Sequence, residues 1–257
     1  VNLNLLNLTA NSLARIESGA FSGLIKLQTL LLDSNRIDTL EAKALKGLKE
    51  LQTLSLSNNS ISYIENGVFS DLNKLTYLSL AMNSIEEITN HTLIGLNSLQ
   101  NLQLNANRIS KIDSWSFIGM SALKSLILSN NKIQYLEPDT FRALVQLNQL
   151  FLDSNKLKSV DQALFSDLAS LTYLDLNQNS FNRIENGTFS GLRNLLALRL
   201  KSNSIVSIES GAFRGLDKLL NLNLYDNGIR HIEKGAFEGL TKLGYLNVAS
   251  NRIGSLD

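Results

Sequence analysis

The chain has 257 residues, 44% of them hydrophobic, with 24 basic and 23 acidic side chains and a formal charge of +1. This balance does not predict a nucleic-acid-binding face, which needs clustered basic residues. No apolar run approaches the roughly 18 residues of a membrane span, so we expect no membrane insertion by this segment. Cysteine is absent, which excludes disulfides, thiolate metal sites and cysteine nucleophiles but leaves the redox compartment open.

An asparagine recurs every 24 residues along the whole sequence. Aliphatic residues precede it by eight, five and three positions, and another apolar residue follows it by two, as Leu147, Leu150, Leu152 and Leu157 do around Asn155. No insertion or deletion interrupts this register, so we predict one continuous array of about eleven repeats over residues 1–257. The asparagines are Asn11, Asn35, Asn59, Asn83, Asn107, Asn131, Asn155, Asn179, Asn203, Asn227 and Asn251.

The first half of each repeat predicts a short β-strand, because apolar and polar residues alternate there. Stacked repeats would pair these strands in parallel and line the concave side of a curved solenoid. The asparagine amide can bond backbone groups where the chain leaves the strand, which predicts a structural ladder of asparagines.

The second half of each repeat is expected to return along the convex side through loops and short helical turns. Ten residues after the asparagine stands a phenylalanine in eight of ten complete repeats, which predicts a buried aromatic column. These are Phe21, Phe69, Phe117, Phe141, Phe165, Phe189, Phe213 and Phe237.

An acidic residue stands six positions after the asparagine in ten of eleven repeats. A carboxylate before a helical turn accepts its backbone N–H groups, so we interpret this column as a row of caps. A cation-binding strip is the alternative. The residues are Glu17, Glu41, Glu65, Asp113, Glu137, Asp161, Glu185, Glu209, Glu233 and Asp257, with Thr89 as the exception.

The pattern L-x-x-L-x-L-x-x-N-x-L, in 24-residue repeats with a phenylalanine at plus ten, resembles the "typical" class of leucine-rich repeats. Toll-like receptor ectodomains, Slit-type ligands, LRIG- and LINGO-type proteins and variable lymphocyte receptors contain this class. The resemblance implies an α/β solenoid horseshoe and an extracellular module that recognises proteins, often on its concave sheet. Such ectodomains normally carry cysteine-rich caps, and neither is present here, so we expect an array without its caps.

No catalytic constellation is predicted. His91 and His231 belong to repeats six apart, and no P-loop, G-x-G-x-x-G or H-E-x-x-H motif occurs. Asp153 and Asp175 lie on neighbouring predicted strands, but two carboxylates without further ligands make a poor calcium site. We therefore expect neither an enzyme, nor a metal site, nor a cofactor.

The outward positions of the predicted strands contain the candidate binding site. Structure alone requires no apolar side chain there, yet Ile127 and Phe151 are expected side by side, with tyrosine and arginine nearby, a composition typical of protein-binding hot spots. Scattered surface apolar residues and a cross-strand Asp175–Arg199 pair are the alternatives. The predicted ligand-binding residues are Ile127, Phe151, Asp153, Tyr173, Asp175, Arg199, Lys201 and Tyr225.

Four Asn-x-Ser/Thr sequons predict glycosylation at Asn7, Asn58, Asn90 and Asn186. A chain this rich in asparagine, serine and threonine contains a similar number by chance, so the sequons support secretion only weakly. Asn90 and Asn186 fall on the expected convex return. Asn7 and Asn58 belong to the expected strand face, where glycans would obstruct the first part of the concavity.

These features favour an extracellular recognition module for a protein ligand or co-receptor, as the ectodomain of a receptor, adhesion or secreted signalling protein. A homophilic adhesion or dimerisation module, in which a second copy of the chain is the partner, is one alternative. A cytosolic scaffold array is the other. We expect no nucleic-acid partner.

Overall fold

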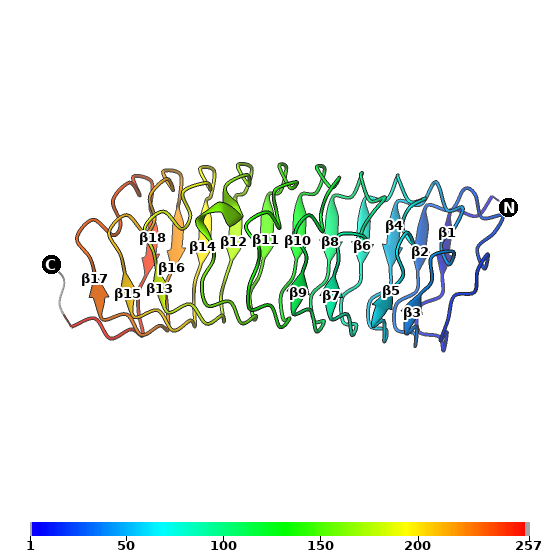
Figure 1. Cartoon of the computed structure of the whole chain (residues 1–257), viewed down its shortest axis with the longest axis horizontal. Helices are drawn as coiled ribbons and strands as arrows, with labels where there is room; N and C mark the ends of the chain where they lie inside the picture. The colour runs from blue at the N-terminus through cyan, green and yellow to red at the C-terminus, as the bar shows by residue number, and fades with distance from the viewer. Residues whose placement is uncertain (1, 255–257) are drawn as a thin grey trace. The chain divides into compact units, whose positions relative to one another are not determined.

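A computed structural model describes residues 2–254. Val1 and residues 255–257 lie outside the described residues, and with them Asp257 of the acidic column. The fold is a parallel β-sheet solenoid with almost no helix (Figure 1). The chain forms two compact units, Val1–Ile127 and Leu128–Asp257, each built from the same 24-residue repeat.

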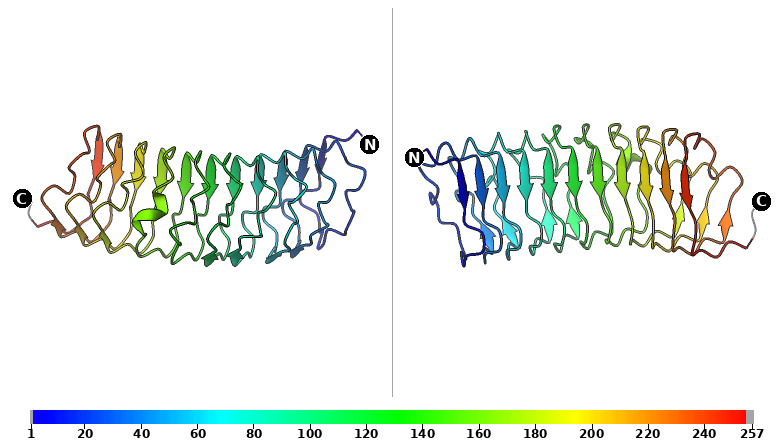
Figure 2. Two further views of the ribbon diagram at one scale, coloured as in Figure 1. Left: turned by 45° about the horizontal axis from the view of Figure 1, so that its top comes forward. Right: turned by 180° about the vertical axis from the view of Figure 1, so that it is seen from behind.

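Each repeat contributes one three-residue strand to a parallel sheet, and paired positions are 24 residues apart (Figure 2). In all but the first and last of these strands the central leucine, such as Leu78 or Leu198, is fully buried, whereas Leu6 is half-buried and Leu246 is 39% exposed. The two residues beside each central leucine face away from the core. The strands of the first unit are, in sheet order, β1 (Leu5–Asn7), β2 (Thr29–Leu31), β4 (Thr53–Ser55), β6 (Tyr77–Ser79), β8 (Asn101–Gln103) and β10 (Ser125–Ile127). Those of the second unit are β11 (Gln149–Phe151), β12 (Tyr173–Asp175), β14 (Ala197–Arg199), β16 (Asn221–Asn223) and β18 (Tyr245–Asn247).

The repeating asparagine joins each repeat to the one before it, which confirms the predicted ladder. The Asn83 amide donates to the carbonyls of Leu80 and Ala81 in its own turn, at 3.1 Å each. It also donates to the Leu56 carbonyl of the preceding repeat at 3.0 Å, and its Oδ1 accepts the Ile61 N–H at 2.9 Å. The amide thus satisfies buried backbone groups of two repeats at once.

The aromatic column is also confirmed. In the second unit the Phe165 and Phe189 rings stack with centroids 6.2 Å apart, as do those of Phe189 and Phe213. Phe213 and Phe237 follow at 5.8 Å. These rings lie on the return side of the core, opposite the sheet.

The return path differs from the expected short helical turns. Among residues 2–254 the only helix is the 3₁₀ helix η1 (Gln162–Phe165). A glycine with φ between 71° and 83° stands eight residues after the asparagine in five repeats, which interrupts a right-handed helix; η1 has Ala163 there. Seven two-residue strands form instead: β3 (Thr39–Leu40), β5 (Tyr63–Ile64), β7 (Glu87–Ile88), β9 (Lys111–Ile112), β13 (Arg183–Ile184), β15 (Ser207–Ile208) and β17 (His231–Ile232).

The acidic column makes contacts both within its own repeat and with the repeat before it. Asp161 does cap η1, because its Oδ1 accepts the Ala163 N–H at 2.8 Å. Glu65 instead accepts the N–H of Ala42, which belongs to the preceding repeat, at 2.8 Å. The same bond joins Glu209 to Asn186 and Glu233 to Ser210. For these glutamates the capping interpretation is wrong, since the turn that they stabilise lies one repeat earlier.

Candidate functional site

The sheet face of the second unit brings most of the predicted binding residues together. Burial of the central leucines of β11, β12 and β14 turns the flanking side chains outward. The strand register places Phe151 beside Asp175, and Asp175 beside Arg199. Tyr173 lies on the same face, one position before the central leucine of β12.

Aromatic rings and cations contact each other across these strands. The Phe151 and Tyr173 rings lie with centroids 5.1 Å apart and planes tilted by 40°. The Arg199 guanidinium carbon lies over the Tyr173 ring, 5.3 Å from its centroid, and the Lys201 Nζ lies over the Tyr225 ring at the same distance. Both distances are within the range of favourable cation–π contacts. The surface is therefore preordered by its own side chains.

Asp175 is the buried polar group of this cluster, with 7% of its surface exposed. The Tyr173 hydroxyl donates to its Oδ2 at 3.2 Å, and the Asn177 N–H donates to its Oδ1 at 2.9 Å. Burial raises the pKa of the Asp175 carboxyl above its usual value. Burial, together with the charge of Asp175, raises the pKa of Tyr173 to about 12.

Two sequence-based expectations about this cluster change. The alternative of an Asp175–Arg199 ion pair is wrong, because the described residues include no such pair and the guanidinium lies over Tyr173. Asp175 was expected among the outward ligand-binding residues but is buried. Ile127 ends β10 in the first unit, half-buried, and its expected contact with Phe151 remains a prediction.

Asp153 lies near the same cluster and is held by hydroxyl groups. The Ser129 and Ser154 hydroxyls donate to its two carboxylate oxygens. Throughout residues 2–254, no three or more His, Asp or Glu side chains gather in a way that could hold a metal ion.

The sheet face of the first unit carries a hydroxyl network that the sequence analysis missed. Asp33 accepts hydrogen bonds from the Ser55 hydroxyl at 2.5 Å and from the Ser57 N–H at 2.7 Å. The Ser57 and Ser79 hydroxyls are 2.6 Å apart, and Ser79 donates to Gln103 at 3.0 Å. The run of serines at outward positions of successive repeats was the available signal.

The four sequon asparagines are exposed, but Asn58 is not on a strand. It occupies the turn after β4 with φ of 54°, in the left-handed position that precedes each repeating asparagine. Asn7 ends β1 on the sheet face, as expected. Asn90 and Asn186 lie on the return path.

Residues 2–254 contain no helix that combines the length and the apolar character needed to cross a membrane.

The comparison with protein families defines the class. The leucine-rich repeat model matches residues 1–61, 49–109, 97–157, 147–205 and 193–253. These matches extend over nearly the whole sequence, and the chain belongs to the leucine-rich repeat family. A search of curated proteins finds no match.

Solved structures place the chain among long repeat proteins. The TLR13–ssRNA13 complex matches with 34% identity and a TM-score of 0.90 over 96% of this chain and 36% of that one. The protein LIC12759 of Leptospira interrogans matches with 30% identity and a TM-score of 0.84 over 98% and 62%. Toll of Drosophila, solved with Spatzle, shares the fold at 22% identity and a TM-score of 0.77, over 96% and 38%.

The chain therefore spans less than two thirds of the length of each of these neighbours. The similarity to TLR13 and Toll confirms the predicted resemblance to the repeats of Toll-like receptors.

Proposed function

We propose that the chain is a non-catalytic recognition module of an extracellular receptor or secreted protein, and that it binds a protein ligand through the sheet face of its second unit. The observation that carries this proposal is the preordered cluster of Phe151, Tyr173 and Arg199. The two similar receptors TLR13 and Toll were each solved with a macromolecular ligand, and Toll in a glycosylated form. These neighbours support recognition as the function of this chain.

The geometry of the cluster suits an anchor for a protein partner. Tyrosine and arginine are enriched among interface residues that dominate binding energy. Tyr173 is held by a ring on one strand, a cation on another and a carboxylate on its own strand. A side chain that is already ordered loses less conformational entropy when a ligand binds. Arg199, Lys201 and Asp153 add the polar rim that surrounds such an anchor.

A nucleic-acid ligand is favoured less, although the TLR13 structure contains single-stranded RNA. Affinity for a phosphate backbone comes mainly from an excess of cations. On this face Arg199 and Lys201 are offset by Asp153 and Asp175, and the whole chain carries a formal charge of only +1. The mixture of both charge signs around aromatic rings instead matches a protein surface.

The proposal is tested by screening immobilised chain against purified secreted and cell-surface proteins by surface plasmon resonance. Every partner is then measured against Phe151→Ala, Arg199→Ala and the matched first-unit variant Leu31→Ala. We expect a partner whose affinity falls at least ~30-fold in the first variant, as for a hot-spot residue. The Leu31 variant should bind normally, because the same strand position in the first unit lies outside the cluster.

Two further measurements separate the alternatives. A single-stranded 13-nucleotide RNA is used as a probe at fixed salt, and sedimentation of the isolated chain reports self-association. Phe151-dependent binding of the RNA, or Phe151-dependent dimerisation without any other partner, would contradict the proposal of a protein ligand.

A further inference from the structure

Two neighbouring repeats of the first unit depart from the polar pattern of the return path. Eight residues after the asparagine, five repeats have glycine, but the Asn83 and Asn107 repeats have His91 and Trp115. Eleven residues after it, these two repeats have Ile94 and Ile118. All other complete repeats have a polar residue there: Ser22, Lys46, Ser70, Arg142, Ser166, Ser190, Arg214 and Glu238.

These departures create an apolar surface exposed to solvent. Trp115 is 41% exposed, Ile94 44% and Ile118 55%. The Ile118 N–H donates to the Trp115 carbonyl at 2.9 Å, so one tight turn presents both side chains. Trp115 has φ of 65°, in the left-handed region where glycines stand in other repeats. A bulky residue is strained there, and such strain commonly accompanies a function of the side chain.

A sequon asparagine lies next to this surface. The register of β7 and β9 pairs Glu87 with Lys111 and Ile88 with Ile112. Residues that follow these strands keep the same 24-residue offset. Asn90 therefore lies opposite Ser114, and His91 opposite Trp115. Neighbouring strands are about 4.8 Å apart, so the repeat that carries Trp115 begins about one strand spacing from Asn90.

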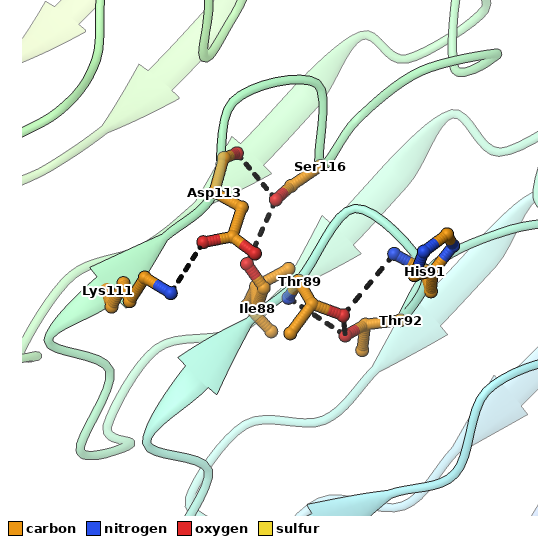
Figure 3. A network of polar contacts seen from close by, with 7 residues as sticks. All are labelled: Ile88, Thr89, His91, Thr92, Lys111, Asp113 and Ser116. Atoms are coloured by element: carbon orange, nitrogen blue, oxygen red, sulfur yellow. Dashed lines mark hydrogen bonds and ion pairs between the residues drawn. The ribbon is translucent and has the colours of Figure 1, made fainter.

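The turn that carries Asn90 is rigidly held (Figure 3). The Thr92 hydroxyl accepts the Thr89 N–H at 3.0 Å and lies 2.9 Å from the Thr89 hydroxyl, which in turn accepts the His91 N–H at 3.3 Å. In the next repeat Ser116 donates to the Ile88 carbonyl at 2.9 Å. Asn90 itself is exposed on this fixed base.

We propose that Asn90 carries an N-linked glycan whose first two N-acetylglucosamine residues lie on Trp115, Ile118 and Ile94. The C–H face of a pyranose ring is apolar and covers aromatic and aliphatic side chains, which removes their surface from water. The two sugars that begin every N-linked glycan extend further than one strand spacing. Because the sugar is covalently attached, its effective concentration at this surface is high.

The modification is an ordinary group transfer in the secretory pathway, and the inference therefore rests on the extracellular location in the proposed function. The co-reactant is a lipid-linked oligosaccharide pyrophosphate. Its anomeric C1–O bond breaks, a bond forms between C1 and Asn90 Nδ2, the amide gives one proton to solvent water, and the lipid pyrophosphate leaves with the bonding electrons. Neither substrate is oxidised or reduced.

The chain contains a matched control for this proposal. Asn186 occupies the same position as Asn90, four repeats later. Its neighbours at the corresponding positions are Gly187 and Gly211 in place of His91 and Trp115, and Ser190 and Arg214 in place of Ile94 and Ile118. A glycan at Asn186 thus has no equivalent apolar surface to cover.

The test uses the whole chain, secreted from mammalian cells behind a signal peptide, as wild type, Asn90→Gln and Asn186→Gln. Peptide mass spectrometry reports occupancy of each sequon. Trp115 is the only tryptophan, so its fluorescence reports directly on this surface. We expect the Asn90→Gln variant to show a red-shifted emission and a roughly twofold larger acrylamide quenching constant, because the glycan shields a ring that is 41% exposed without it. Asn186→Gln should match wild type.

An unmodified Asn90 in the secreted chain would overturn the inference, as would an occupied Asn90 whose substitution leaves Trp115 fluorescence unchanged. Binding of the protein ligand to the same variants separates this inference from the proposed function. If no variant shows Phe151-dependent binding of a protein ligand, but Asn90→Gln still changes the Trp115 fluorescence, only the proposed function is contradicted.

Discussion

The sheet faces of the two units carry different chemistry on the same backbone. The first unit presents small side chains whose hydroxyls bond one another, from Asp33 through Ser55 and Ser79 to Gln103. The second presents rings and cations, such as Phe151 stacked on Tyr173. Both faces follow strands of the same length and register.

The difference shows which positions the fold constrains. The central leucine of each strand and the asparagine that follows it are used in both units, because burial and backbone hydrogen bonds require them. The outward positions meet no such requirement. Their chemistry in the second unit is therefore not required by folding, and we propose that it serves recognition.

The largest expected effect concerns the shared frame. Asn83→Ala in the first unit and Asn179→Ala in the second should each lower the free energy of unfolding by about 3 kcal/mol, since each leaves several buried backbone groups unsatisfied. Each asparagine makes four such bonds, to its own turn and to the preceding repeat. Chemical denaturation of the whole chain measures both values. A clearly smaller loss in one unit would show that the two frames are not equivalent.

The next largest effect is the difference in ligand affinity between variants on the sheet faces of the two units. Phe151→Ala should weaken binding of the protein ligand by about 2 kcal/mol, as expected for an interface anchor. It should leave the melting temperature of the chain nearly unchanged. Leu31→Ala, at the same strand position in the first unit, should affect neither. Calorimetric titration and thermal unfolding of both variants check this. Equal losses of affinity would extend the site to the first unit and remove the contrast.

A smaller effect is expected from the hydroxyl network. Ser79→Ala removes contacts to Ser57 and Gln103 and should cost about 1 kcal/mol of stability, the typical net value of buried hydrogen bonds. It should leave ligand affinity unchanged. Thermal unfolding and the same calorimetric titration test both parts, and a loss of affinity without a loss of stability would mean that this face also binds.

The smallest effect concerns Asp175 and depends on pH. Burial raises the pKa of this carboxyl in the folded chain. Its contribution to stability is therefore fully present below the unfolded pKa and is lost as pH rises through the raised folded pKa. Asp175→Asn should make the chain slightly more stable than wild type at pH 7, with the difference vanishing near pH 3. Urea unfolding at both pH values measures it. A variant that is less stable at pH 7 would show that Tyr173 and Asn177 stabilise the ionised carboxylate.

Much of the fold was predictable because one pattern is repeated along the chain. The strands, the asparagine ladder and the phenylalanine column each depend on residue types that recur at fixed positions. A residue that fits the pattern by chance in one repeat does not recur in the others, so the repeats together distinguish a real pattern from a coincidence. Left-handed turns at glycines such as Gly67 follow in the same way. The family comparison agrees with that assignment.

The missed features depend on contacts between repeats and on side-chain conformation. Glu65 reaches Ala42, 23 residues earlier, and Ser57 meets Ser79, 22 residues later. No local pattern indicates which repeat a long side chain will contact. For Arg199, opposite charges on adjacent strands suggested an ion pair with Asp175, but the guanidinium lies over the Tyr173 ring. Most of the predicted site residues are close together in the second unit, whereas their energetic roles could not be assigned from spacing.

The asparagine ladder has a mechanical consequence. Each asparagine bonds only its own repeat and the one before it, as Asn83 does with Leu56 and Ile61. Within a unit, a pulling force applied along the stacking direction is therefore transmitted through these junctions in series. The weakest junction breaks first, and every rupture releases 24 residues, which extend to about 80 Å at ~3.4 Å per residue. Under tension, each unit would lengthen in equal steps while the repeats that remain joined keep their binding surface intact.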